Sequence, residues 1–296
     1  MSEWGSPAHL TVLRHALSAS LDGDVRGVTL EVEPDGVRLG FPLNVLVRWN
    51  VLLEGQPGLG STDMLRVVAG VRRWLLARLW VGQPLEMLTG SLMVVAMASG
   101  AVGHPGDTWT QESVPGGVLT LGVGVEGADP QHPDAVIAVP RSVWEHAGVS
   151  PEMLQGWWPV LRERHERLGG LCAERFLASP GHERALRGTG GHDVLTLLGS
   201  ASLRAALAGS DGVGLVGVAV PTRAHGFLMN RMVDPAFLAV LTAAASAADV
   251  GVAGPVLVTR DEVVRVVQRR VALVSSALEN ALVVDVRQVG VVSFFA

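Results

Sequence analysis

Three side chains in the second half of the sequence could together do acid–base chemistry: Asp193, Arg223 and His225. A carboxylate and an imidazole can move protons, and a guanidinium can stabilise a developing negative charge. Arg223 and His225 follow the apolar run Leu215–Pro221 directly, at a point where a strand end could present them to a cleft. If the three groups share a pocket, they predict a small-molecule hydrolase or transferase, which is the alternative function.

Each of these side chains also has a structural explanation. Asp193 precedes an apolar helical segment and is a good N-cap for it, and a loop histidine at position 225 needs only solvent. His192, beside the cap, has the same simple explanation. The bend Gly188–Gly191 precedes a helix but follows no predicted strand and offers no lysine, so we expect a flexible connector there rather than a phosphate-binding loop.

No metal or cofactor site is predicted. Asp129, His132 and Asp134 could hold a metal ion from one loop, but the prolines between them equally indicate an ordinary turn. The sequence contains no Walker loop, dinucleotide fingerprint, nucleophile elbow or paired-histidine zinc helix. Its single cysteine, Cys172, allows neither an intramolecular disulfide nor a cysteine zinc site, and we expect it in the core. We therefore favour a protein that is not an enzyme.

Two adjacent tryptophans, Trp157 and Trp158, are the candidate partner surface. They fall in a predicted helix that begins at Pro151. Neighbouring helical positions point about 100° apart around the axis, so one ring could contact a partner while the other is buried. The alternative is that both rings are buried beside a wide apolar stripe.

Composition narrows the class of protein. Hydrophobic residues make up 48% of the 296 residues and charged residues 17%, so a sizeable core is available. All 23 basic residues are arginine, as expected from a GC-rich bacterial genome. The net charge of −5 disfavours a general nucleic-acid binder, and a nucleic-acid accessory protein is the weakest alternative. Charged residues interrupt the most apolar stretch of the sequence, so we expect no membrane-spanning helix. The N-terminus lacks the pattern of a secretory signal peptide, so we expect a cytoplasmic protein.

The elements that must position these residues indicate an α+β fold. Two apolar runs, Val136–Arg141 and Val216–Arg223, meet a proline and then an arginine, which is typical of buried strands that stop at the proline. We expect two modules of helices packed on mainly antiparallel sheets, 1–168 and 169–296, with Gly169 and Gly170 ending a helix at the boundary. The first module is predicted as helix (9–21), three strands (28–33, 37–39 and 45–53) and helix (64–80).

Further elements follow from local pattern. The stretch 85–101 fits a buried helix or a strand, 104–117 predicts an exposed loop, and 118–125 and 135–139 predict an antiparallel pair. One helix is expected from Asp193 through Leu207 and another over 234–249. Thr259–Glu262 predicts a capping box that opens a helix, and 281–295 predicts a hairpin.

Two stretches of the sequence carry the pattern of a family. The first comprises Leu10–Leu17, the Pro34-Asp35-Gly36 turn, Val45–Trp49 and Met64–Leu79. The second comprises Gly191-His192-Asp193, the helix through Leu207, Leu215–Pro221, Thr222-Arg223 and Phe227-Leu228-Met229. Both resemble the YtpQ-like family of uncharacterised bacterial proteins, which implies an α+β fold and no established activity. The family's acidic positions fall at Ala224 and Gly190, so the resemblance implies no acidic site.

The function we expect is a non-enzymatic protein-binding or scaffold module. The order helix, three strands, helix is similar to the secretion-chaperone type of fold, whose members commonly dimerise and hold protein partners. The expected partner is a protein or a second copy of the chain in a homodimer.

Overall fold

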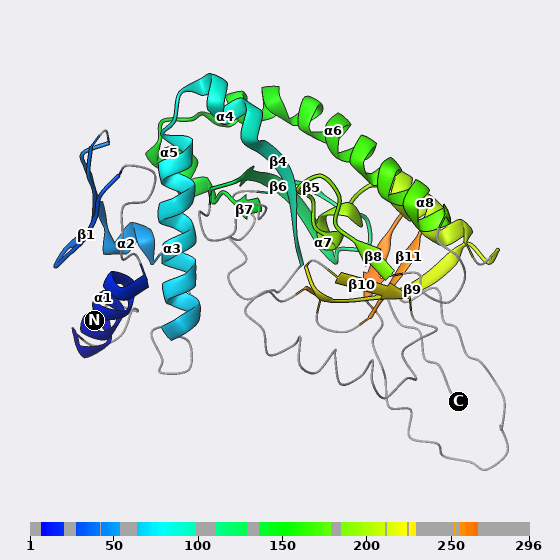
Figure 1. The fold of residues 1–296 in the computed structure, drawn as a ribbon, viewed down its shortest axis with the longest axis horizontal. Helices are drawn as coiled ribbons and strands as arrows, with labels where there is room; N and C mark the ends of the chain where they lie inside the picture. The colour runs from blue at the N-terminus through cyan, green and yellow to red at the C-terminus, as the bar shows by residue number, and fades with distance from the viewer. Residues whose placement is uncertain are drawn as a thin grey trace, which may run out of the picture. The chain divides into compact units, whose positions relative to one another are not determined.

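The computed structural model describes residues 7–20, 28–41, 43–53, 64–98, 110–128, 136–178, 185–210, 212–223, 225–228, 251–252 and 255–265. Within these ranges the chain forms eight helices and three antiparallel sheets, which confirms the predicted α+β class (Figure 1). The chain divides into two compact units. Unit 1 contains Met1–Val95, Val102–Gln111 and Gly122–Leu161, and unit 2 contains Ala96–Ala101, Glu112–Leu121 and Arg162–Ala296.

The N-terminal part of unit 1 has the predicted order of helix, three strands and helix. Helix α1 packs against strand β1 and helix α3 (Figure 1). The predicted hairpin is confirmed, because Glu33 pairs with Gly36 across a tight turn. The elements are α1 (Pro7–Ser20), β1 (Leu30–Glu33), β2 (Gly36–Leu39), β3 (Val45–Arg48), α2 (Trp49–Leu52) and α3 (Met64–Val81).

The third strand is shorter than predicted because Trp49 begins the short helix α2. The backbone N–H of Trp49 donates to Asp35 O at 3.1 Å, and its indole Nε1 donates to Pro34 O at 2.9 Å. Both bonds tie the end of β3 to the hairpin turn. The chain therefore leaves the sheet at Trp49 instead of continuing to Leu53.

The stretch 85–101, predicted as either a helix or a strand, forms a helix over 85–91 followed by a strand over 92–98. The predicted antiparallel pair is confirmed, with Val125 opposite Ile137. The predicted exposed loop is wrong at residues 110–113, which form a strand beside β6, and Val114 N–H donates to Leu119 O to extend the hairpin. Residues 104–109 of that prediction lie outside the described residues. The elements are α4 (Leu85–Ser91), β4 (Leu92–Ala98), β5 (Thr110–Ser113), β6 (Leu119–Glu126), β7 (Val136–Ala138), α5 (Arg141–His146) and α6 (Pro151–Ala178).

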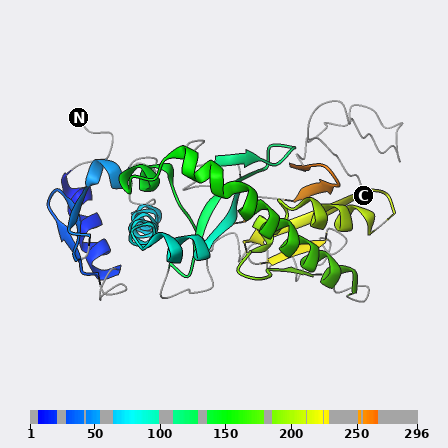
Figure 2. The same ribbon diagram turned by 90° about the horizontal axis from the view of Figure 1, so that it is seen from above.

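Unit 2 contains a five-stranded antiparallel sheet in the order β12-β11-β9-β10-β8. Helix α8 packs on β9 and β11, and Figure 2 shows it beside the C-terminal half of α6. The predicted single helix after Asp193 is two helices, because the chain bends at Gly199 and Ser200. The elements are β8 (Ala185–Arg187), α7 (Val194–Leu197), α8 (Ala201–Gly209), β9 (Leu215–Thr222), β10 (His225–Leu228), β11 (Val256–Thr259) and β12 (Val263–Arg265).

Helix α6 continues through Gly169 and Gly170, so the predicted stop at this glycine pair is wrong. A Cβ at position 169 would lie 1.9 Å from Ser200 Oγ. Glycine is needed there because the N-terminus of α8 approaches the helix backbone closely. The expected division of the chain between residues 168 and 169 falls inside this helix and stays a prediction.

Of the two prolines predicted to end a strand, Pro140 does so and Pro221 does not. Pro140 follows β7 and is the N-cap residue of α5, as a terminating proline should be. Strand β9 instead runs through Pro221 and ends at Thr222.

The predicted capping box at Thr259–Glu262 opens no helix. Thr259 Oγ1 accepts from Glu262 N–H at 3.1 Å, but Thr259 N–H donates to Glu262 O at 3.0 Å and extends the hairpin between β11 and β12. The following residues form β12, which pairs with β11. The cap pattern was present locally, and pairing with a neighbouring strand overrode the helical tendency.

Several predictions lie outside the described residues. These are the loop of Asp129, His132 and Asp134, the helix over 234–249 and the hairpin over 281–295. Among the helices that the structure describes, none has the length and apolarity needed to cross a bilayer.

Candidate functional site

The structure brings together two of the three predicted reactive residues, Asp193 and Arg223. Asp193 is the N-cap of α7, and its Oδ1 accepts from Thr196 N–H at 2.7 Å. Its Oδ2 accepts from Arg223 Nε at 2.7 Å and lies 2.6 Å from Nη2. The carboxylate therefore joins a helix start to a strand end, and both of its oxygens have internal partners.

His225 does not join this pair. It is exposed at the start of β10, opposite Thr222, and its Nδ1 lies 3.1 Å from Thr222 Oγ1. Within the described part of the chain, no hydrogen bond or ion pair connects His225 to Asp193 or Arg223. The three residues share a neighbourhood of the β9–β10 turn without forming the hydrogen-bonded relay that a general base needs.

The two candidate partner residues, Trp157 and Trp158, are both half-buried on α6. The Trp157 ring packs against Trp144 of α5, with centroids 6.4 Å apart and planes inclined by 59°. Both tryptophans lie one turn from the buried residues Leu154 and Leu161, Trp157 at i+3 and i−4 and Trp158 at i+4 and i−3. The two rings therefore flank the row formed by Leu154 and Leu161.

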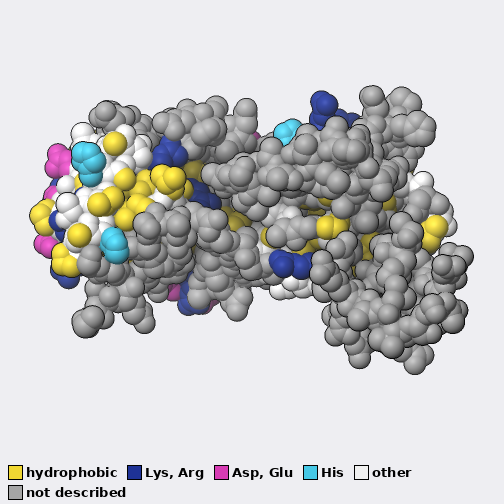
Figure 3. All heavy atoms as spheres, turned by 90° about the horizontal axis from the view of Figure 1, so that it is seen from below, with side chains coloured by type: hydrophobic (Ala, Val, Ile, Leu, Met, Phe, Trp, Pro, Cys, Tyr) yellow, Lys and Arg dark blue, Asp and Glu magenta, His cyan; other side chains and the backbone are white. Residues whose placement is uncertain are grey.

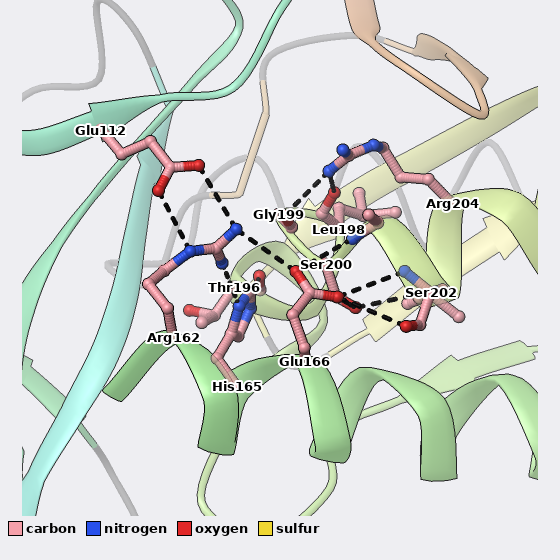
Figure 4. Close-up of polar contacts among 12 residues, drawn as sticks. Glu112, Arg162, His165, Glu166, Thr196, Leu198, Gly199, Ser200, Ser202 and Arg204 are labelled. Carbon is pink, nitrogen blue, oxygen red and sulfur yellow. Dashed lines mark hydrogen bonds and ion pairs between the residues drawn. The ribbon is translucent and has the colours of Figure 1, made fainter. Parts of the chain in front are cut away.

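A network of charged groups in unit 2 was not predicted from the sequence. Arg162 Nε lies 3.1 Å from Glu112 Oε2, and its Nη2 lies 3.2 Å from Glu166 Oε1 (Figure 4). Its Nη1 lies 2.6 Å from His165 Nδ1. One arginine thus links two carboxylates and an imidazole. The spacing of Arg162, His165 and Glu166 at i, i+3 and i+4 was the available signal, but the Glu112 partner comes from 50 positions away.

Glu166 ties α6 to the start of α8. Its Oε2 accepts from Ser200 Oγ at 2.8 Å and from Ser202 N–H at 3.3 Å, while Oε1 accepts from Ala201 N–H at 3.2 Å (Figure 4). Burial alone would raise the pKa of Glu166, but these hydrogen bonds and the charge of Arg162 lower it. The carboxylate stays ionised and satisfies N–H groups that a helix start leaves free.

His165 is completely buried in this network. Its Nε2 lies 2.9 Å from Thr196 O, an atom that can only accept a hydrogen bond, so Nε2 carries the proton. Nδ1 is then free to accept from the Arg162 guanidinium. Burial lowers the pKa of His165 to about 4, so the ring is neutral near neutral pH.

The bend Gly188–Gly191, predicted as a flexible connector, contains a tight turn. Thr189 and His192 exchange backbone hydrogen bonds of 2.9 and 3.1 Å, and Gly190 and Gly191 both have positive φ, 57° and 79°. These are the features of a type I′ turn, which requires residues like glycine at both central positions. The turn stacks the His192 ring on His165, with centroids 5.4 Å apart.

Thr196 connects the predicted pair to the unpredicted network. Its N–H donates to Asp193, its carbonyl accepts from His165, and its Oγ1 accepts from Ala96 N–H at 3.0 Å.

Cys172 of α6 is buried, as the sequence predicted, and burial raises the pKa of its thiol. The described residues contain no group of three His, Cys, Asp or Glu side chains suited to a metal ion.

The arrangement is best suited to stabilising unit 2. Arg162, Glu166 and Asp193 all bind partners within the chain, and His165 is shielded from solvent. No protein-family model matches the chain, and no curated protein or solved structure was found to be similar to it. The resemblance to the YtpQ-like family therefore stays a prediction.

Proposed function

We propose that the chain is a non-enzymatic protein-binding module that binds a second copy of itself through one side of helix α6. The surface consists of Met153, Trp157 and Val160 and is called the α6 stripe. The proposal retains the expectation of a bacterial cytoplasmic protein. The single cysteine is compatible with that compartment.

The supporting observation is the exposure of large apolar side chains at helical spacing. Met153 is 41% exposed and Val160 is 68% exposed. Half-buried Trp157 lies at i+4 from Met153, and Val160 lies at i+7. Residues at this spacing share one helix face. Contiguous apolar side chains on a surface are typical of interaction sites.

A second copy is the occupant that suits this stripe. In a two-fold symmetric contact the same patch meets itself, so a charge at the centre of the patch would face the same charge on the other copy. The three residues of the α6 stripe are uncharged, so they can pack against their own copies without that repulsion. Tryptophan at the centre supplies the aromatic anchor that binding surfaces favour.

Trp158 is expected to act differently from Trp157. It is half-buried and lies outside the row of Met153, Trp157 and Val160, so Trp158→Ala should lower the free energy of unfolding rather than weaken self-association alone.

Sedimentation velocity over a range of concentrations tests the proposal. We expect a concentration-dependent dimer in the unmodified chain and a monomer in Val160→Asp, because a carboxylate would be desolvated between two apolar stripes. Val160 is exposed, so the substitution should leave the unfolding free energy nearly unchanged.

The matched control is Val12→Asp, which introduces the same charge at a 54% exposed valine of α1. Hydrophobic side chains also gather at this end of unit 1, around α1 (Figure 3). The proposal requires that Val12→Asp remains dimeric. A monomer at every concentration of the unmodified chain, or loss of the dimer only in Val12→Asp, contradicts it.

The two other functions stay predictions. A hydrolase or transferase site would need His225 to converge with Asp193 and Arg223 when a substrate binds. A nucleic-acid accessory role would require binding at low salt, which can be measured by fluorescence anisotropy.

A further inference from the structure

Helix α6 presents a row of side chains to the turn between β8 and α7, residues 187–192. The row lies along one side of the helix, because its members follow at i, i+3, i+7 and i+10: His165, Leu168, Cys172 and Arg175. At the first of these positions, the His165 ring stacks on the His192 ring with planes inclined by 24°. The 187–192 turn therefore packs lengthwise along α6.

The other contacts between this turn and α6 are few. A Cβ at position 190 would lie 2.8 Å from Leu168 Cδ2, so the backbone of the turn packs directly on the helix. Arg175 Nη1 donates to Thr189 Oγ1 at 3.3 Å. Cys172 Sγ lies 3.7 Å from Arg187 O, and its side chain is only 4% exposed. The thiol is therefore shielded by the segment that carries His192.

His192 is buried without hydrogen bonds. Its side chain is 2% exposed, and neither ring nitrogen has a hydrogen-bond partner among the described residues. A neutral imidazole has one donor and one acceptor, and buried polar groups of this kind are normally satisfied. Opening of the turn would give both nitrogens the hydrogen bonds to water that the closed turn denies them.

The groups that act on His192 leave its ring neutral. They are the neutral His165 ring and Arg164 on α6, together with Asp193 in its own segment, and α7 contains no ionisable side chain. Burial is the largest effect on the pKa of His192 and lowers it, and Arg164 acts in the same direction. Asp193 and the Gly190 backbone oppose this, but the net shift is downward.

We propose that the 187–192 turn is an acid-sensitive switch, in which protonation of His192 releases the turn from α6 and exposes Cys172. A charged ring has no acceptor and no water in the closed turn, whereas the open turn hydrates it. The closed turn is fully favoured above the ordinary histidine pKa of about 6.5 and loses that advantage as the pH falls. This switch lies in unit 2 and does not depend on self-association through the α6 stripe.

The reactivity of Cys172, the single cysteine of the chain, tests the switch. The rate of its reaction with 4,4′-dithiodipyridine is measured on the full chain and on the chain unfolded in guanidinium chloride at the same pH. The ratio of the two rates removes the pH dependence of the thiol and the reagent. We expect constant protection above about pH 6.5 and a loss of roughly tenfold per pH unit below it, because opening takes up one proton.

Low concentrations of urea separate opening of the turn from unfolding of unit 2. A short turn exposes little surface when it opens, so the reaction rate should hardly change with urea, whereas global unfolding responds steeply. Acid-induced reactivity that rises steeply with urea would assign the exposure of Cys172 to global unfolding and overturn the proposal.

Two variants assign the proton to His192. His192→Phe keeps a ring for the stack on His165, and His192→Leu is the second choice of a side chain that does not titrate. Either should make the protection of Cys172 independent of pH. His15→Phe, at an exposed histidine of α1, is the control and should keep the response of the unmodified chain. An unchanged slope in a folded His192 variant, or protection that does not vary with pH in the unmodified chain, contradicts the proposal.

Discussion

Two buried arginines, one in each unit, have nearly the same exposure and very different surroundings. Arg204 in unit 2 is 7% exposed, and Arg78 in unit 1 is 9% exposed. Arg204 Nη1 donates to Gly199 O at 2.8 Å and Leu198 O at 3.2 Å, and its Nε donates to Arg260 O at 3.4 Å. Among the residues that the structure describes, Arg78 makes a single hydrogen bond, to His146.

The charges around the two arginines also differ, because carboxylates lie near Arg204 and, within the described ranges, none acts on Arg78. Burial lowers the pKa of both arginines, but around Arg204 the carboxylates of Glu166, Asp261 and Glu112 oppose that effect. The comparison teaches that burial by itself does not assign a role to a charged side chain. A buried cation with several acceptors ties the fold together, whereas one without a compensating carboxylate is an electrostatic cost to the folded state.

The largest expected effect concerns pH and unit 2. His165 has a folded-state pKa of about 4 against an ordinary value of 6.5, so below that value the unfolded chain binds more protons than the folded one. Its stabilising contribution is fully present above pH 6.5 and is lost as the pH falls towards 4. The loss should approach about 3 kcal/mol, from roughly 1.4 kcal/mol for each pKa unit.

Urea unfolding of unit 2 across this pH range measures the effect. His165 faces His192, Arg162 and Glu166, so the loss belongs to this cluster. His165→Gln can still donate to Thr196 O without titrating, and it should remove most of the pH dependence. An unchanged pH profile in that variant would assign the acid sensitivity to other groups.

A smaller loss is expected for Arg204→Met. The substitution leaves the carbonyls of Leu198 and Gly199 without their donor, which should lower the unfolding free energy by about 2 kcal/mol. Chemical denaturation followed by tryptophan fluorescence measures it. A change near zero would mean that solvent replaces the guanidinium, and the contrast with Arg78 would lose its basis.

The smallest effect is expected for Arg78→Met, the matched substitution in unit 1. Removing a buried charge that lacks a carboxylate should change the unfolding free energy by no more than about 1 kcal/mol, and in the stabilising direction. The same denaturation experiment measures it. A loss as large as that of Arg204→Met would show that Arg78 has a structural role equal to that of Arg204.

Local pattern predicted most of the helices and strands of the described chain. The apolar spacing of α1 and α3 predicted two helices, and the Pro34-Asp35-Gly36 turn predicted a hairpin. The structure confirms all three. Errors occurred where a distant segment competed with local preference. Gly169 does not end α6 because Ser200 packs against it, and Thr259 opens no helix because it lies in β11 opposite Leu215 of β9.

The candidate sites divide in a similar way. The N-cap role of Asp193 could be predicted from the sequence, because an N-cap depends only on the next few residues. Its pairing with Arg223 joins positions 30 apart, and the Glu112 partner of Arg162 is 50 positions away. No spacing rule connects such residues, so the network could not be predicted.

The amino-acid sequence alone therefore determined the α+β class, the order of elements in the first part of the chain, the cap at Asp193 and the turn at Pro34-Asp35-Gly36. These depend on side-chain periodicity and on backbone preferences that act over a few residues. Only the tertiary structure decided which charges were paired. Whether a guanidinium such as that of Arg78 pairs with a carboxylate depends on which distant segments pack together. Local sequence pattern does not predict that packing.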